Sequence, residues 1–315
     1  MFVRRLLWLL LASCTTSEPT KIARLFADPL TQSAVFAAST EGRVFMCGDY
    51  LDGIVSTTCS EIPQLHGATS ISRSRVWFAP FEQCASLANG SVSCQTCNDG
   101  LPSCGSWNPR PNTSGVVEVN RGCAVLADGS TACWGDLTLG TFPLPVSHLV
   151  AAFALLSDGS LFTRHGLRID GIDHVTDASQ SSQGLKMPSA CAVTSDTSLY
   201  CWGSNDFGQL GDGTTQERTA PTLVGNGFLQ VVQTPDNTND AAACALTTVG
   251  SLVCWGQTVG ALTPVALGVT SVQQLVVQPS ASPAVTDILG QFYALTVDGT
   301  IIELSLTGGK PLTIQ

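Results

Sequence analysis

The sequence predicts an all-β protein folded as a seven-bladed β-propeller. Three observations predict this fold class: a hairpin pattern that recurs seven times, many turn-forming and strand-forming residues, and cysteines at one repeated spacing. The chain has 315 residues, of which 44% are hydrophobic and 12% are charged. A chain of this length can bury a sizeable core, and so little charge excludes a disordered chain.

Each predicted hairpin is centred on a turn residue, which is glycine in every copy but one. These turn residues are Gly42, Gly90, Gly129, Gly159, Thr197, Gly250 and Gly299. Successive turns are 30 to 53 residues apart, with a mean of about 43. Short strands at this period are typical of propeller blades rather than of helical solenoids. The fourth copy lacks the cysteines and the Trp-Gly pair, so we expect irregular blades, with six regular blades as the alternative count.

Cysteine spacing within the hairpins predicts cross-strand disulfides. In 123-CAVLADGSTAC-133, a three-residue turn that ends at Gly129 places Cys123 opposite Cys133. Directly opposed residues of an antiparallel pair lie within disulfide distance. The same register predicts three further pairs, which are Cys84–Cys94, Cys191–Cys201 and Cys244–Cys254. The cysteines of residues 191–201 are therefore interpreted as a staple of the hairpin and not as nucleophiles.

The remaining cysteines outside the N-terminus are paired by proximity, as Cys47–Cys59 and Cys97–Cys104. The rival interpretation makes Cys94-Gln95-Thr96-Cys97 half of a zinc site. A zinc knuckle needs a second cysteine pair at similar spacing, and the sequence has none. We therefore expect neither a metal nor a cofactor.

The N-terminus has the pattern of an export signal. Arg4 and Arg5 precede the apolar run Leu6–Leu11, which is too short to span a bilayer. Residues 11–14, Leu-Ala-Ser-Cys, resemble the lipobox of bacterial lipoproteins, which implies cleavage before Cys14 and acylation of Cys14, with palmitate among the acyl chains. Thr15 in place of Asp after that cysteine implies the outer membrane. An ordinary secretory signal is the alternative.

These patterns divide the chain into three parts. We expect a lipoprotein signal peptide at residues 1–13, a short lipid-anchored tether at 14–19, and the propeller at 20–315. The lipid on Cys14 is then the sole attachment to the membrane. The expected location is the bacterial cell envelope, as an outer-membrane lipoprotein, with a secreted protein as the alternative.

Charge and motifs exclude several functions. The net charge of −10 repels phosphate backbones, so we expect no nucleic-acid binding. The sequence has no G-x-S-x-G elbow, no P-loop and no H-E-x-x-H zinc motif. Asp206 and Asp212 lie beside glycines but lack the spacing and the final Glu of a calcium loop. The histidines are interpreted as lone surface residues; they are His66, His148, His165 and His174. We therefore expect a protein that is not an enzyme.

Residues 191–213 resemble the repeat of the regulator of chromosome condensation family, in its cysteine-containing secreted bacterial form. The matching residues are Cys191-Ala192-Val193, Tyr200-Cys201-Trp202-Gly203-Ser204-Asn205 and Gly208-Gln209-Leu210-Gly211-Asp212-Gly213. The secreted beta-lactamase-inhibitory protein II is related in fold. The resemblance implies seven blades of four strands over most of the chain. It also raises guanine-nucleotide exchange on a small GTPase, which export, disulfides and acidity oppose.

The repeat assigns structural roles to several residues. Gly208 and Gly211 are expected to allow tight turns between blades. The recurring tryptophans are expected to pack between neighbouring sheets, with an aromatic binding surface for a sugar or partner as the alternative; they are Trp134, Trp202 and Trp255. The ring is expected to close by pairing residues 21–26 with the last blade. The innermost strands are interpreted as small and apolar.

The resulting functional hypothesis is a non-catalytic protein-interaction scaffold anchored to the cell envelope. Its partner is an unidentified extracellular or periplasmic protein. The expected contact regions are loops 98–115 and 205–219, with Trp107, Phe207 and Arg218 as anchors, because aromatic and arginine side chains carry much interface energy. The alternative is a surface carbohydrate-binding protein or glycan-acting enzyme that uses the propeller face. That function needs converging polar side chains on the innermost strands.

Overall fold

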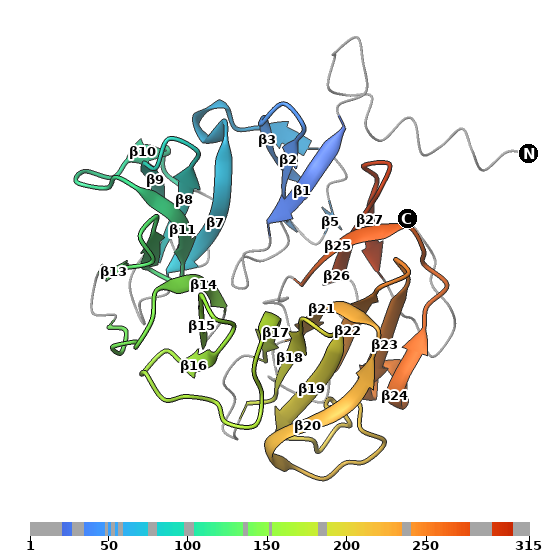
Figure 1. Ribbon diagram of the computed structural model, residues 1–315. Helices are drawn as coiled ribbons and strands as arrows, with labels where there is room; N and C mark the ends of the chain where they lie inside the picture. Colours follow the sequence, from blue (N-terminus) through green and yellow to red (C-terminus); the bar gives the residue numbers. More distant parts are fainter. Residues whose placement is uncertain are drawn as a thin grey trace, which may run out of the picture.

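The computed structural model describes residues 21–26, 35–47, 50–51, 54–55, 59–74, 81–97, 104–134, 138–150, 153–181, 188–234, 241–277 and 292–304. Within these residues the protein is all-β, and seven antiparallel sheets stand around a ring (Figure 1). The predicted fold class, a seven-bladed β-propeller, is therefore confirmed.

The blades follow one another along the chain, and each blade is built from consecutive strands. Blade 1 contains β1 (Ile22–Phe26), β2 (Val35–Ser39), β3 (Val44–Cys47) and β6 (Cys59–Glu61). Blade 2 contains β7 (Ala68–Ser74), β8 (Phe81–Leu87), β9 (Val92–Cys97) and β10 (Asn108–Pro109). Blade 3 contains β11 (Val116–Asn120), β12 (Cys123–Leu126) and β13 (Thr131–Cys133). Blade 4 contains β14 (Val146–Val150), β15 (Phe153–Leu156) and β16 (Leu161–Thr163).

The second half of the ring is built in the same way. Blade 5 contains β17 (Val175–Gln180), β18 (Ala190–Thr194), β19 (Ser198–Gly203) and β20 (Arg218–Asn226); blade 6 contains β21 (Phe228–Gln233), β22 (Ala242–Thr247), β23 (Leu252–Gly256) and β24 (Ala261–Ala266); blade 7 contains β25 (Val272–Val277), β26 (Phe292–Thr296) and β27 (Ile301–Leu304). Outside the blades lie a small ribbon and two short 3-10 turns, which are β4 (Tyr50–Leu51), β5 (Ile54–Val55), η2 (Pro63–Leu65) and η3 (Gln257–Val259).

Blades 3, 4 and 7 have three strands among the described residues, whereas the other blades have four. The irregular fourth copy predicted from the sequence is one of these three. After β16, the chain of blade 4 makes a turn and then touches the sheet again only through an isolated bridge between Phe162 and Arg168. The absence of cysteines and Trp-Gly in that copy therefore coincides with a shorter sheet.

Each blade has a tight turn between its second and third strands, which we call its tip. The seven tip residues aligned in the sequence all have positive φ, from 68° at Thr197 to 88° at Gly299. Glycine adopts this conformation without steric cost, whereas a threonine does not. The hairpin alignment is therefore confirmed, and the strained copy is the one in blade 5.

The tips also join each blade to the next. The carbonyl oxygen of Gly129 accepts a hydrogen bond from Val146 N–H of the following blade at 2.9 Å, and the carbonyl of Gly159 accepts one from Val175 N–H at 2.8 Å. A Cβ atom at Gly129 would lie 2.3 Å from the Cβ of Pro145. Glycine is thus required at this tip both by its φ and by the close approach of the next blade.

Strand direction alternates within each sheet, so the molecule has two chemically different faces. The tips and the starts of the first strands share one face, which we call the tip face, because hydrogen bonds join them. The turns that leave the first and third strands lie on the opposite face, which we call the loop face.

The hydrophobic core is divided among the interfaces between neighbouring blades. One cluster, for example, joins Cys191, Leu199 and Leu210 of blade 5 to Ala245 and Trp255 of blade 6. The other clusters join the remaining neighbours in the same way. Each sheet therefore buries both of its faces against another sheet, which fixes the blades relative to one another.

The expected closure of the ring by strand pairing is wrong for residues 21–26. β1 pairs with β2 of its own blade and not with blade 7. The seam is instead bridged by the side-chain amide of Gln274, whose Oε1 accepts a hydrogen bond from Leu25 N–H and whose Nε2 donates one to Leu25 O, both at 2.8 Å. Apolar contacts of Leu25 with Val276 and Leu295 complete the seam.

Candidate functional site

The hairpin cysteines form disulfides across adjacent strands. The structure contains Cys84–Cys94, Cys123–Cys133, Cys191–Cys201 and Cys244–Cys254, with Cα–Cα distances of 4.0–4.1 Å, and also Cys97–Cys104. These are the pairs that the sequence predicts, because the cysteines of each hairpin stand directly opposite each other in the strand register. The stretch at residues 191–201 is therefore one stapled hairpin of a repeating scaffold.

The first blade repeats the arrangement in its backbone. Cys47 on β3 stands directly opposite Cys59 on β6, and Cys59 is disulfide-bonded. The side chain of Cys47 lies outside the part that the structure describes. Cys14, with the rest of the predicted signal peptide and tether, also lies outside the described residues.

The longest described loop on the loop face connects β19 to β20 in blade 5, at residues 204–217. Asn205 holds this loop together from inside: its Nδ2 donates to Thr214 O at 3.0 Å and to Gln216 O at 3.1 Å. Its Oδ1 accepts a hydrogen bond from Leu210 N–H at 3.0 Å. Both Asn205 and Leu210 are buried, so the loop is an ordered part of the core.

The glycines of this loop allow it to pack against blade 6. A Cβ atom at Gly211 would lie 2.6 Å from Nε1 of Trp255, and one at Gly208 would lie 2.3 Å from Cδ2 of Leu262. The indole N–H of Trp255 donates to Gln209 O at 2.9 Å. Gly208 and Gly211 therefore allow a close contact between blades, as the sequence predicts.

Asp212 is used within the loop. Its carboxylate accepts hydrogen bonds from Thr214 N–H at 3.0 Å and from Arg218 Nε at 2.7 Å. Burial raises the pKa of the Asp212 carboxyl, but the hydrogen bonds from Thr214 and Arg218 outweigh burial and hold the pKa below its ordinary value. The carboxylate is thus a turn-stabilising group whose oxygens already accept hydrogen bonds.

The three anchor residues expected from the sequence do not form one exposed surface. Trp107 is buried in the core between blades 1 and 2, so its expected role as an exposed anchor is wrong. Arg218 is paired with Asp212, and Phe207 is half-buried in the same loop. Of the three expected anchors, only Trp107 is buried in the core. Residues 98–103 of the other expected contact loop lie outside the described residues.

The recurring tryptophans lie between neighbouring sheets. Trp255 is fully buried between blades 5 and 6, and Trp202 packs against Phe153 of blade 4 with ring centroids 5.9 Å apart. Trp134 packs at the interface of blades 2 and 3, beneath the guanidinium of Arg110 at 4.7 Å from the ring centroid. Their shared register thus reflects inter-blade packing and not an exposed aromatic surface.

The innermost strands are not lined only by small apolar residues, contrary to the interpretation of the sequence. In each blade, a β-bulge in the first strand is followed by one exposed or half-buried polar residue. We call these seven equivalent residues the polar ring: Arg24, Ser70, Glu118, His148, Asp177, Gln230 and Gln274. These residues cannot be identified from the regular alternation of side chains along a strand, because each bulge shifts the register by one residue.

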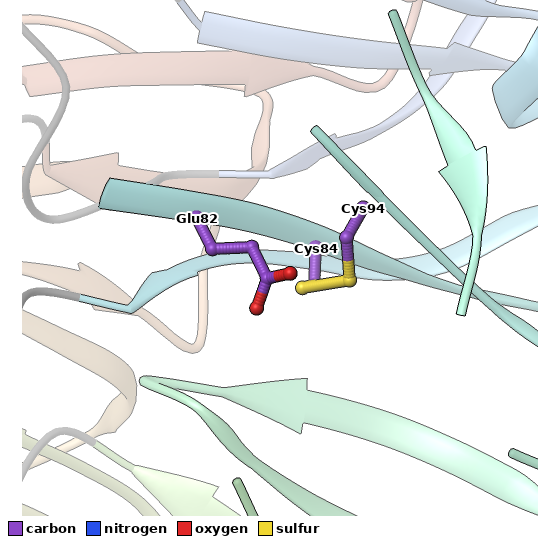
Figure 2. Close-up of side chains that lie close together, drawn as sticks. All are labelled: Glu82, Cys84 and Cys94. Atoms are coloured by element: carbon purple, nitrogen blue, oxygen red, sulfur yellow. A yellow bond between two sulfur atoms is a disulfide. The ribbon is translucent and has the colours of Figure 1, made fainter. Parts of the chain in front are cut away.

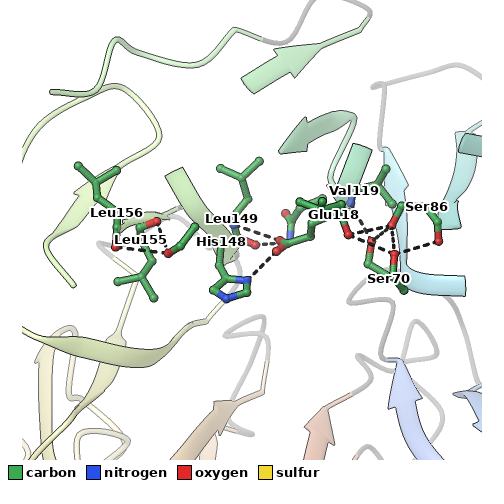
Figure 3. A network of polar contacts seen from close by, with 12 residues as sticks. Ser70, Ser86, Glu118, Val119, His148, Leu149, Leu155 and Leu156 are labelled. Atoms are coloured by element: carbon green, nitrogen blue, oxygen red, sulfur yellow. Dashed lines mark hydrogen bonds and ion pairs between the residues drawn. The ribbon is translucent and has the colours of Figure 1, made fainter. Parts of the chain in front are cut away.

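Most of the polar ring joins one blade to the next. Side-chain oxygens accept hydrogen bonds from backbone N–H groups of the following blade: Ser70 from Val119 at 2.7 Å, Glu118 from Leu149 at 3.0 Å, Asp177 from Val231 at 2.8 Å, Gln230 from Leu275 at 2.8 Å, and Gln274 from Leu25 at 2.8 Å. Figure 3 shows the part that runs from Ser70 through Glu118 to His148. The ring therefore has a structural role at the centre of the propeller.

One part of the polar ring titrates. His148 Nδ1 lies 2.8 Å from Glu118 Oε2, and the hydrogen bond to Glu118 raises the pKa of the His148 imidazole. Burial raises the pKa of the neighbouring Asp177 carboxyl to about 7, although the hydrogen bond from Val231 opposes the shift. The sequence interpretation treated His148 as a lone surface residue, because its partner comes from another blade 30 residues away.

The other histidines, His66, His165 and His174, are exposed. Only one cluster of described residues has the composition of a metal site, and it consists of Glu82, Cys84 and Cys94 (Figure 2). The two sulfur atoms are bonded to each other, so neither is a thiolate ligand, and Glu82 pairs with Arg110 at 2.6 Å. This cluster does not fit a metal. Beside it is an open pocket of about 430 Å³, lined by Glu82, Cys94, Thr96, Asn108, Pro109, Arg110 and Pro111.

Across the described residues, we find no helix with the length and apolar character needed to cross a membrane.

Comparison with known proteins identifies the repeat. Residues 196–234 match the model of the Regulator of chromosome condensation (RCC1) repeat, which places the match from the tip of blade 5 to the first strand of blade 6. A segment of 140 residues, 42% of this chain, is 28% identical to the E3 ubiquitin-protein ligase HERC2 of Homo sapiens and of Mus musculus. The match spans only 2% of those much longer proteins.

Solved structures share the fold at low sequence identity. Prp20p from Saccharomyces cerevisiae is 14% identical, with a TM-score of 0.58 over 86% of this chain and 81% of that chain. The Cps50 (Swd1) β-propeller domain from Myceliophteria thermophila is 11% identical, with a TM-score of 0.53 over 92% of this chain and 99% of that chain. These likenesses show that the chain shares the β-propeller fold, and the family model shows one RCC1 repeat, in blade 5 and the start of blade 6.

Proposed function

We propose that the protein is a non-catalytic protein-interaction scaffold, held at the bacterial cell envelope by lipid on Cys14. The observation that carries the proposal is the construction of the ring. Disulfides staple individual hairpins, core clusters fill the interfaces between blades, and the polar ring joins them at the centre. Such a frame presents broad surfaces in a fixed geometry, which lowers the entropic cost of binding a partner.

Protein partners are typical of RCC1-like propellers. Prp20p, for example, is described together with its binding properties to Gsp1p and histones. The identity of those partners belongs to that protein. What supports the proposal for this chain is the shared fold and the repeat matched at residues 196–234.

The cell envelope is supported by two features of the chain. Multiple disulfides are consistent with an exported protein, because thiols stay reduced in the cytosol. The N-terminal Leu11-Ala12-Ser13-Cys14 resembles a lipobox, and Thr15 favours the outer membrane over the inner one. The partner is then an extracellular or periplasmic protein. A secreted form without lipid is the alternative.

The anchor and the partner are tested in one experiment. The full-length protein and its Cys14→Ala variant are expressed in host cells fed an alkyne palmitate, fractionated, and crosslinked on intact cells before mass spectrometry. We expect the label and the membrane fraction to depend on Cys14, and one protein to be enriched with the anchored form. A labelled, membrane-bound Cys14→Ala protein would contradict the anchor. Enrichment of glycan without any protein would contradict the scaffold.

The polar ring favours a second candidate, carbohydrate binding at the centre of the propeller. That function requires polar side chains that converge on the innermost strands, and the seven ring residues meet this requirement. Most of their oxygens are used between blades. Arg24 and His148 are the two exposed members of the ring, and each makes a hydrogen bond, from Arg24 Nη1 to Thr69 O at 3.0 Å and between His148 Nδ1 and Glu118, so that part of each side chain faces solvent. Binding of a glycan array that is lost in Arg24→Ala together with His148→Ala would favour this candidate.

A further inference from the structure

The tip face carries an arc of three exposed aliphatic side chains on the neighbouring blades 6 and 7. The arc consists of Leu229, Val249 and Val297, which are 49%, 80% and 58% exposed. Backbone hydrogen bonds bring the segments that carry these side chains together: Thr248 N–H, beside Val249, donates to Gly227 O, and Val272 N–H donates to Gly250 O, both at 2.9 Å. Val297 N–H donates to Ser271 O of the same junction at 2.8 Å. We call these three residues the tip arc.

The tip of blade 6 has a valine where most other tips have an acidic residue. The middle position of the tip is acidic in five blades, at Glu41, Asp128, Asp158, Asp196 and Asp298, whereas blade 6 has Val249 there. Hydrogen bonds from the side chains of Thr194 and Thr296 hold the pKa of Asp196 and Asp298 below its ordinary value. Both carboxylates are exposed and stand on the tips of blades 5 and 7, to either side of the tip that carries Val249. Lys21 lies beside Gly299, next to Asp298, so the carboxylate of blade 7 has a lysine close to its tip.

The loop face does not offer an equivalent surface among the residues expected to bind. Trp107 is buried, Arg218 is paired with Asp212, and the loop at 204–217 is held by Asn205. A single exposed apolar residue is common on proteins, whereas several that gather within a polar rim are typical of an interaction site. The contact regions expected from the sequence thus lie on the loop face, whereas the tip arc lies on the opposite face.

We propose that the tip arc is the docking site of the scaffold, and that its partner is a protein with aliphatic side chains surrounded by lysine or arginine. The inference rests on the proposed scaffold function and adds the face and the chemistry of the partner. An aliphatic centre supplies burial without unpaired polar groups, and the carboxylates of Asp196 and Asp298 attract a cationic rim.

The test uses the full-length chain on host cells, with a photo-crosslinking amino acid at one position at a time. Val249 is the test position on the tip arc. Leu223, which is 50% exposed on the outer strand β20, and Glu217 on the loop face are the matched controls. We expect position 249 to crosslink one protein, at residues next to lysine or arginine. Crosslinks only from positions 217 or 223 would overturn the tip arc and leave the scaffold function standing. No protein crosslink from any position would overturn both.

The partner identified by crosslinking is then purified, and its affinity for variants separates the contribution of the aliphatic side chains from that of the carboxylates. We expect Val249→Ser with Val297→Ser to weaken binding about tenfold or more, and Leu223→Ser to leave it unchanged. Asp196→Asn with Asp298→Asn removes charge while keeping the turn, since Asn89 already forms the same turn in blade 2 by accepting Ser91 N–H at 3.0 Å. This pair should weaken binding about three- to tenfold at low salt and have less effect at high salt. Unchanged affinity in both double variants would overturn the proposal.

Discussion

At the residue scale, Thr197 shows the cost of departing from the repeat. It is the one tip residue of the seven that is not glycine, yet its φ is 68°. Its carbonyl accepts hydrogen bonds from Gly227 N–H and Phe228 N–H of the next blade, at 2.9 and 3.0 Å, so the junction holds it in this conformation. A left-handed conformation costs a residue with a Cβ roughly 1–2 kcal/mol.

We therefore expect Thr197→Gly to stabilise the protein by about 0.5–1 kcal/mol, because relief of strain exceeds the added flexibility of the unfolded chain. Urea unfolding measures the change. Gly250→Thr, the same position in blade 6, should lose a similar amount, since a Cβ there meets no atom closer than 3.4 Å. A Thr197→Gly protein less stable than wild type would contradict the strain argument.

The His148–Glu118 pair predicts a pH dependence of stability. The hydrogen bond to Glu118 raises the pKa of His148 in the folded state, so protonated His148 stabilises the fold. This stability is fully present below the unfolded pKa of about 6.5 and is lost as pH rises through the higher folded pKa. In Glu118→Gln we expect the His148 ring titration, followed by NMR, to move to lower pH. An unmoved titration would show that Glu118 is not the cause.

At the element scale, the bulge in each first strand decides which side chain faces the centre of the ring. In blade 7, it places Gln274 where its amide bonds both polar groups of Leu25 across the seam. In blade 6, it places Gln230 where its Oε1 accepts a hydrogen bond from Leu275 N–H of blade 7. The bulged first strand thus supplies two hydrogen bonds between blades 7 and 1, and one between blades 6 and 7.

Gln274→Ala should accordingly destabilise the protein by about 1–2 kcal/mol, since two hydrogen bonds at the seam are lost. Hydrogen exchange of the Leu25 amide should accelerate together with the loss of stability. Gln273→Ala is the matched control, because that neighbour is exposed on the same strand. Equal effects of the two substitutions would rule out the amide of Gln274 as the bridge of the seam.

The sequence predicted elements whose partners are close along the chain. The pairing of Cys123 with Cys133 follows from a turn of three residues, and the positive φ of six of the seven tips follows from their glycines. It did not predict contacts between blades. His148 and Glu118 are 30 residues apart, and Leu25 and Gln274 are 249 apart, so no local pattern links them. Nor does residue type distinguish the buried Trp107 from an exposed anchor.

At the scale of the whole molecule, the disulfides differ in exposure. Both cysteines of Cys191–Cys201 and both of Cys244–Cys254 are fully buried in the core, whereas Cys104 is exposed and is bonded to Cys97. Thiol–disulfide exchange requires a thiolate to reach a sulfur atom. A reductant should therefore open the disulfides of the propeller in a defined order.

We expect a mild reductant to open Cys97–Cys104 first in the native protein, while Cys191–Cys201 and Cys244–Cys254 remain closed until the protein unfolds. Mass spectrometry after alkylation at successive times reports the order. Removal of one buried staple, by Cys191→Ser with Cys201→Ser, should cost about 2–3 kcal/mol, as the chain-entropy model gives for so short a loop. Early alkylation of Cys191 in the folded protein would contradict this order.

The seam between blades 7 and 1 determines whether the order of the blades along the chain can be changed. Among the described strands, no sheet combines strands from both ends of the chain, because β1 pairs within blade 1 and β25 within blade 7. Joining the two ends by a flexible linker and opening the chain between any other two blades would leave every described sheet intact. The protein is in this sense suited to circular permutation, and a partner could be tethered at any chosen blade.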